Sequence, residues 1–153
     1  MPKHDYILNE IDIVYRPVKT LSRRPVVTSP DMAYKLFREN WDSMKIGIVE
    51  EFKIMLLTRA NQVLGIAPVF RGGISGTVVD PKVIFAIALK SGASGIIMAH
   101  NHPSGNLEPS EADLAMGRKI GDIGELLSIN LVDNLILSGI NKTYNSILDT
   151  MSF

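Results

Sequence analysis

The sequence of 153 residues contains no cysteine, so disulfide bonds and thiolate metal ligands are both excluded. It also lacks any apolar run close to the ~20 residues that a membrane-spanning helix needs. Its first residues do not contain the apolar core of a secretory signal. These absences predict a cytoplasmic protein without a membrane segment.

An excess of charge of either sign is missing as well. The 16 Lys and Arg residues balance 16 Asp and Glu residues, and the formal net charge is zero. Proteins dedicated to nucleic-acid binding usually carry a basic surplus, so we expect no strong autonomous binding to nucleic acid. A hydrophobic fraction of 46% and a charged fraction of 21% are typical of a soluble globular protein. We expect one globular unit, with its core in residues 46–153 and an extension, residues 1–45, packed on that core.

Strand patterns alternate with helical patterns along the chain, which predicts an α/β fold. Three helical patterns begin at Ser29-Pro30, at Asp80-Pro81 and at Pro109-Ser110. In the first of these, Ser29 is the expected cap and Pro30 occupies the first turn. The first two helices should run to about residues 41 and 91. Strands are expected over 10–15, 52–58, 62–70, 95–102 and 130–138, with a short terminal element over 143–153.

Two of the three histidines stand two residues apart in the stretch 98–113, which reads M-A-H-N-H-P-S-G-N-L-E-P-S-E-A-D. Alternate side chains of a strand share a face, so His100 and His102 should point the same way. Two imidazoles and a carboxylate can occupy three corners of a zinc tetrahedron and leave the fourth for water, which is typical of catalytic sites. Asp113 is the expected carboxylate, because it falls on the inward stripe of the third helix, formed by Met116, Ile120, Ile123 and Leu127.

Ser110 and Asp113 also fit a second interpretation. Ser110 is a suitable N-cap for the third helix, and Asp113 would lie near the positive end of the helix dipole. A cap needs no metal. The sequence alone leaves both interpretations open.

The spacing His-x-His, seven residues, Ser, two residues, Asp resembles the JAMM motif of the JAB/MPN metalloprotease superfamily. The longer string A-H-N-H-P-S-G-x-x-x-P-S-x-x-D is similar to its bacterial RadC-like branch, long labelled as DNA-repair proteins. The similarity runs from about Glu50 to Ser146. It includes E-x-F before an apolar strand, G-x-x-x-G-T-V-V-D-P before a helix and L-V-D-N-L-I-L in a late strand.

This resemblance implies a three-layer α-β-α fold with a central mixed sheet, similar to that of cytidine deaminases. It implies one zinc ion per chain, bound by His100, His102 and Asp113. It also implies that Ser110 helps to hold an oxyanion and that an upstream glutamate acts as general base. The implied activity is peptidase or isopeptidase hydrolysis of a peptide or protein substrate.

Two glutamates precede the strand 52–58, and alternation puts them on opposite faces. Glu50 shares its face with an apolar row that begins at Phe52 and should point into the protein. Glu51 shares its face with Lys53, and we expect that pair at the surface. The E-x-F pattern of the family also selects Glu50, which is therefore the predicted general base.

The chain departs from the RadC-like pattern at two places. Residues 1–45 contain no glycine-rich helix-hairpin-helix, which full-length members often carry, and Asp133-Asn134 stands where the family often has Asp-His. A zinc-dependent hydrolase is the leading hypothesis. The alternatives are a metal-binding interaction domain without turnover and a DNA-repair accessory domain.

Overall fold

The computed structural model describes residues 23–72 and 79–148. These residues form a five-stranded sheet with the order β2-β1-β3-β4-β5. Only β3 and β4 are parallel, and the other neighbouring pairs are antiparallel, so the sheet is mixed. The strands are β1 (Glu51–Leu57), β2 (Val63–Arg71), β3 (Gly95–His102), β4 (Asn130–Ser138) and β5 (Tyr144–Ser146).

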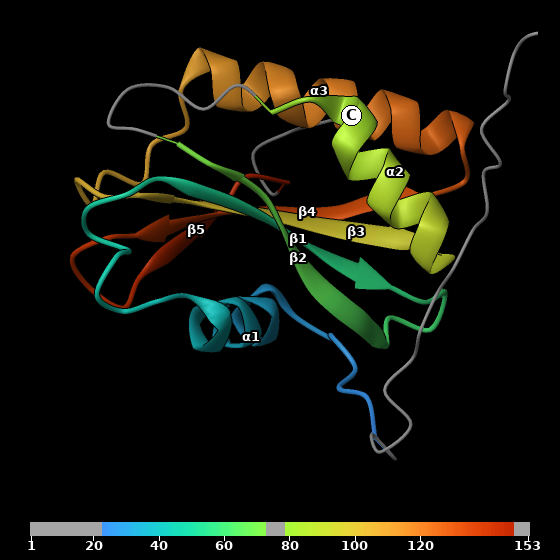
Figure 1. Cartoon of the computed structure of the whole chain (residues 1–153), viewed down its shortest axis with the longest axis horizontal. Coiled ribbons are helices and arrows are strands. Elements are labelled where there is room, and N and C mark those ends of the chain that lie inside the picture. Colours follow the sequence, from blue (N-terminus) through green and yellow to red (C-terminus); the bar gives the residue numbers. More distant parts are fainter. Residues whose placement is uncertain (1–22, 73–78, 149–153) are drawn as a thin grey trace, which may run out of the picture.

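Helices cover both faces of this sheet (Figure 1). α1 (Pro30–Asn40) lies on one face, and α2 (Pro81–Ser91) and α3 (Glu111–Leu126) lie on the other. Each face has its own apolar core: Phe37 and Met55 belong to the α1 side, and Ile54 and Ile84 to the α2–α3 side. The predicted three-layer α-β-α architecture with a mixed sheet is therefore confirmed.

The local signals in the sequence explain where the elements begin. Ser29 accepts a hydrogen bond from the Met32 amide at the start of α1, and Asp80 accepts one from the Lys82 amide at the start of α2. α2 ends at Gly92, whose φ of 68° is a left-handed conformation that glycine adopts without strain. The expected strand over 10–15 lies outside the described residues, as does the end of the expected terminal element over 143–153.

β1 is buried along its whole length, and this corrects one prediction. Glu51 and Lys53 do lie near each other, with Lys53 Nζ 3.8 Å from Glu51 Oε2, but they are not a surface pair. Their exposed fractions are 2% and 7%. α1 covers their face: Lys53 Nζ donates to the Asn40 carbonyl oxygen at 2.9 Å and lies 4.7 Å from the ring centroid of Trp41.

The buried face of α3 differs from its predicted apolar stripe. Its buried residues are Gly117, Ile120 and Gly124, and a Cβ at Gly124 would lie 2.2 Å from the Ile129 carbonyl oxygen. Leu127, predicted to face inward, is 42% exposed. The helix ends at Leu126 and the chain turns at Leu127, so the helical stripe does not continue to that residue.

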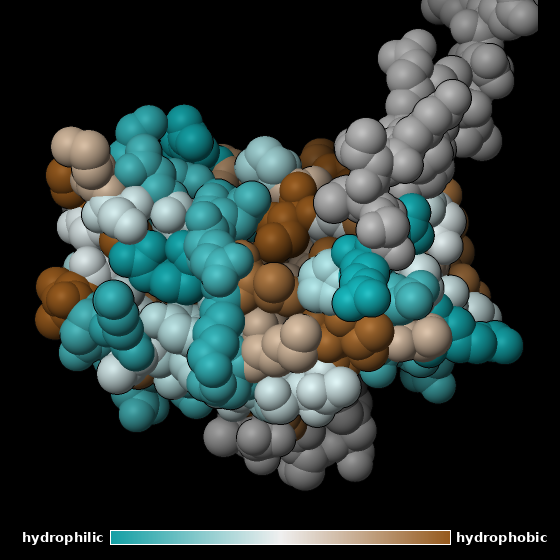
Figure 2. Space-filling view, turned by 90° about the horizontal axis from the view of Figure 1, so that it is seen from below, coloured by the Kyte–Doolittle hydropathy of each residue, from teal (hydrophilic) through white to brown (hydrophobic). Residues whose placement is uncertain are grey.

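The face of the molecule that carries α1 is largely hydrophilic, with a smaller group of apolar side chains (Figure 2). Beside α1, a hollow is lined by residues that include Val26, Ala33 and Val132. None of the helices within residues 23–72 and 79–148 combines the length and the apolarity that a bilayer crossing demands.

Candidate metal centre

The site lies at the end of β3, where its antiparallel pairing with β1 ends. Phe52 of β1 pairs with His100 of β3, and their rings stack with centroids 5.9 Å apart and planes 5° apart. Continuing the same register by two residues brings Glu50 opposite His102. Strand pairing therefore places the predicted base beside the two histidines.

His100, His102 and Asp113 converge on one point. The two Nε2 atoms are 3.1 Å apart. The Asp113 carboxylate oxygens lie 3.3 Å from Nε2 of His100 and 3.5 Å from Nε2 of His102. These separations are near the edges of a tetrahedron of ligands around a metal ion, which are about 3.3 Å when the metal–ligand distances are about 2.0–2.1 Å.

The ring of His102 is oriented by a second contact, because its Nδ1 donates to the backbone carbonyl oxygen of Asn106. A carbonyl oxygen can only accept, so Nδ1 carries a proton, and Nε2 is the ring nitrogen directed into the site. Metal-binding histidines usually have such an outer partner.

Asp113 comes from the first turn of α3, where it has two functions in the fold. Its Oδ2 accepts from the backbone N–H of Ser110 at 2.8 Å, and its own N–H donates to Ser110 Oγ at 3.1 Å, which together form a capping box. Burial alone would raise the pKa of Asp113, but hydrogen bonds with His100 and His102 outweigh burial and hold that pKa well below its usual range. The hydrogen bond with Asp113 raises the pKa of His102, against the opposing effect of burial.

Ser110 is exposed, and its Oγ is the acceptor in the capping box. This is the geometry of the cap interpretation. The oxyanion role of Ser110 stays a prediction, as do the proposed roles of the other site residues.

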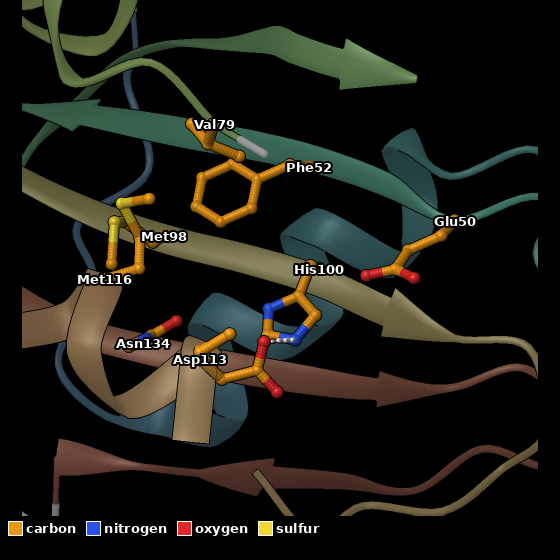
Figure 3. A pocket seen from close by; sticks show the side chains of 9 residues that line it. Glu50, Phe52, Val79, Met98, His100, Asp113, Met116 and Asn134 are labelled. Carbon is orange, nitrogen blue, oxygen red and sulfur yellow. Dashed lines mark ion pairs between the residues drawn. The ribbon is translucent and has the colours of Figure 1, made fainter. Parts of the chain in front are cut away.

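Glu50 is the second carboxylate at the site. One carboxylate oxygen of Glu50 and one ring nitrogen of each histidine lie within 4.8 Å of one another, a group that could hold a metal ion. Figure 3 shows Glu50 on the side of His100 away from Met116 and Asn134, with its carboxylate directed toward the ring. The two histidines therefore have two carboxylate neighbours, Glu50 and Asp113, either of which could complete a metal site with them.

A cavity of about 180 Å³ opens beside His100. Its polar lining includes Glu50, Asp113 and Asn134, and the rest of its wall is mostly apolar: Phe52, Val79, Met98, Ala112 and Met116 (Figure 3). The departure noted at Asp133-Asn134 therefore falls partly within the site. Asn134 faces this cavity, and Asp133 accepts a hydrogen bond from Ser146 Oγ.

Asn101, between the two histidines, is a residue that the sequence analysis missed. It is fully buried on the opposite face of β3. Its Oδ1 accepts from the Glu51 amide at 2.7 Å, and its Nδ2 donates to the carbonyl oxygens of Ile46 and Val49 at 2.7 and 2.9 Å. These bonds fix the backbone on both sides of Glu50. The signal available in the sequence was a polar residue inside a buried strand.

The model of the RadC-like JAB domain family matches residues 27–151, which is most of the chain. The chain belongs to the RadC-like JAB domain family. The predicted membership of the RadC-like branch is confirmed, and the match includes α1 as well as the sheet and the metal centre.

Relatives of this RadC-like domain occur in several bacteria under the name UPF0758 protein. The one from Flavobacterium johnsoniae is 42% identical over 100 residues, covering 65% of this chain and 43% of the relative. The one from Finegoldia magna is 34% identical over 143 residues, covering 90% of this chain and 61% of the relative. The chain thus spans about half the length of the relatives it matches.

The contacts of Asp113 predict a pH-dependent stability in the metal-free domain. A lowered folded-state pKa stabilises the fold above the unfolded value of about 3.9, and this contribution is lost as the pH falls. The raised pKa of His102 stabilises the fold below about 6.5 and is lost as the pH rises through the folded value. The stability difference between wild type and Asp113→Asn should therefore be largest between about pH 4 and 6.5.

Urea unfolding of both proteins in chelator across this pH range measures that difference. The capping box also favours the charged carboxylate, so loss of the box alone would give a difference that falls at low pH but stays constant as the pH rises. A stability difference that does not fall above about pH 6.5 would contradict the proposed contacts of Asp113 with the histidines.

The capping box predicts that Ser110→Ala lowers the free energy of unfolding by about 1 kcal/mol, because the Asp113 amide loses its acceptor. Metal content should not change. An additional oxyanion role would appear as a rate loss on the order of 10²–10³ in the fully folded, metal-loaded variant. Thermal melting and turnover kinetics separate the two effects, and an unchanged rate would leave Ser110 with the cap alone.

Proposed function

We propose that this RadC-like domain is a zinc-dependent hydrolase of JAMM type that cleaves peptide or isopeptide bonds. The observation that carries the proposal is the convergence of two imidazole nitrogens and the Asp113 carboxylate, with Glu50 beside them. A site built only for structure would usually surround the metal with four protein ligands. Here the second carboxylate borders an open cavity instead.

The donor set supports zinc as the metal. Two nitrogens and a carboxylate oxygen at tetrahedral spacing match the preferences of zinc, whereas Ca²⁺ and Mg²⁺ prefer sets of oxygen ligands. We assign His100, His102 and Asp113 as the ligands of one zinc ion per chain. A zinc ion held there would supply Lewis acidity, lowering the pKa of a water and polarising a scissile carbonyl.

Glu50 is the proposed general base. Its carboxylate takes a proton from the attacking water and passes it to the leaving nitrogen, a transfer that needs only hydrogen-bonding distance. Phe52 keeps the ring of His100 in place by stacking, and Asn101 holds the backbone next to Glu50. Contacts on one face of the sheet therefore position the ligand His100, and contacts on the other face position the backbone of the base.

The cavity beside His100 indicates which kind of substrate side chain would lie next to the scissile bond. Its apolar wall includes Phe52, Val79, Met98 and Met116, and its volume of about 180 Å³ would hold one bulky side chain. For comparison, an apolar protein cavity of about 150 Å³ binds benzene. We propose a peptide or protein substrate with a large apolar or aromatic residue at this position.

The ligand assignment is tested by metal analysis of the purified protein. Wild type should contain about one zinc per chain, and His100→Ala or His102→Ala should lose stoichiometric zinc, because two remaining ligands bind the ion too weakly. His4→Ala, which removes the third histidine of the chain, is the matched control and should keep its zinc. A His100→Ala/His102→Ala double variant with unchanged zinc would show that the ligands lie elsewhere.

Catalysis is tested by screening the zinc-loaded protein on a peptide library and on isopeptide-linked peptides. Glu50→Gln should keep the fold and the zinc but lose hydrolysis by roughly 10²–10⁴-fold, the usual contribution of a general acid–base group. Glu108→Gln removes an exposed carboxylate from the loop before α3 and should remain as active as wild type. Glu51 is a poor control, because burial beside Lys53 makes its replacement a change to the core.

Two results would count against the proposal. Equal activity of Glu50→Gln and wild type would remove this carboxylate from the mechanism. A zinc-loaded wild type that cleaves nothing in either library would favour the interaction domain without turnover.

A further inference from the structure

The two histidines of the site differ in their outer contacts. Nδ1 of His102 donates to the Asn106 carbonyl oxygen, whereas Nδ1 of His100 is buried without a hydrogen-bond partner among the described residues. A buried polar atom without a partner costs about 1–3 kcal/mol, so native structures rarely leave one. The ring of His100 is held by stacking on Phe52, which does not satisfy this nitrogen.

A second polar atom without a partner lies in the same cavity. Oδ1 of Asn134 is also buried and unpaired within the described part of the chain, and the side chains of Asn134 and His100 both line the cavity. The exposed fraction is 2% for Asn134 and 3% for His100. One atom can only accept a hydrogen bond, and the other can donate one.

The strand register brings these two atoms to the same face of the sheet. Asn134 of β4 pairs with Met98 of β3, and His100 follows Met98 by two residues, so all three side chains share the α2–α3 face. Figure 3 shows the amide oxygen of Asn134 directed toward the His100 ring, on the side of the ring away from Glu50.

We propose that Asn134 is the positioning residue for His100: its Oδ1 accepts the Nδ1–H of His100, either directly after a small shift of the side chain or through one water in the cavity. This inference rests on the proposed metal-binding function. Asn134 would do for His100 what the Asn106 carbonyl does for His102. With both Nδ1 protons held, both Nε2 lone pairs are directed at the point where the Asp113 oxygens converge.

The proposal explains why a polar side chain occupies the interior of β4 at this position. Its neighbours on the cavity wall include Met98, Val79 and Met116, among which a leucine would pack without cost to hydrogen bonding. An amide fits there if it satisfies a polar group nearby. Within the described part of the chain, the unpaired His100 Nδ1 on the same cavity is such a group.

Two variants and one control test the proposal. Asn134→Leu keeps the approximate shape and removes the acceptor, whereas Asn134→Asp keeps an acceptor at the same place. Met116→Leu changes an apolar residue in the wall of the same cavity, removes no hydrogen-bonding group and is the matched control. Zinc affinity, measured by competition with a chromogenic chelator, should fall about 10- to 100-fold in Asn134→Leu, the usual effect of losing an outer contact of a ligand.

Zinc affinity should remain near the wild-type value in Asn134→Asp and Met116→Leu. The side-chain NMR signal of the His100 Nδ1–H provides the second measurement, and it needs no activity. We expect this proton in zinc-loaded protein, where Nε2 of His100 would bind the metal, with a chemical shift that moves downfield in Asn134→Asp, because a carboxylate is the stronger acceptor.

The outcomes separate this inference from the proposed function. Unchanged zinc affinity in folded Asn134→Leu, or an Nδ1–H shift that is the same in wild type and Asn134→Asp, would overturn the role of Asn134. If Asn134→Leu does not fold, the Nδ1–H chemical shift of His100 in wild type and in Asn134→Asp still tests the role of Asn134. A protein that binds zinc with the expected NMR signature but cleaves no substrate would refute hydrolysis alone. A protein that binds no zinc would refute the metal site and, with it, the role of Asn134.

Discussion

The last three residues of β3 place their side chains alternately on the two faces of the sheet, and the rest of the site depends on this alternation. Alternation directs His100 and His102 toward α3 and directs Asn101 toward the layer that contains α1. The histidines can approach each other to 3.1 Å because they share a face. Asn101 fixes the segment before β1 through three hydrogen bonds on the other face. A change in register by one residue would exchange these two sets of side chains and remove the site.

Opposite charges and hydrogen bonds hold the side chains of the candidate site together. Asp113 carries its charge at the N-terminus of α3, where the helix dipole favours a carboxylate, and it contacts both histidines. The low pKa of Asp113 means that the carboxylate is charged throughout the physiological range. A cation of the proposed kind would therefore meet side chains that are already gathered, and the fold would not have to reorganise.

Much of this arrangement follows from local signals in the sequence. The bounds of β3 and β4, the starts of all three helices and the shared face of the two histidines could be predicted because they depend on alternation and on capping residues. The predictions for Glu51 and Lys53 failed because alternation says which residues share a face but not whether a helix covers it. α1 supplies that cover, because Asn40 and Trp41 at its end contact Lys53. The positions of Asn101 and Asn134 depend on strand pairing across the sheet, which a single sequence does not specify.

Asp113 is both the third residue of a capping box and a proposed metal ligand, and this double use links the ion to the beginning of α3. Helix ends are the parts of a helix that open most easily by local fluctuation. Each opening of the first turn would withdraw one of the three ligands, so the lifetime of the bound ion would depend on how rarely that turn frays. A stronger cap would then slow the release of the metal, so the capping box would affect the dissociation rate of the ion as well as the stability of the helix.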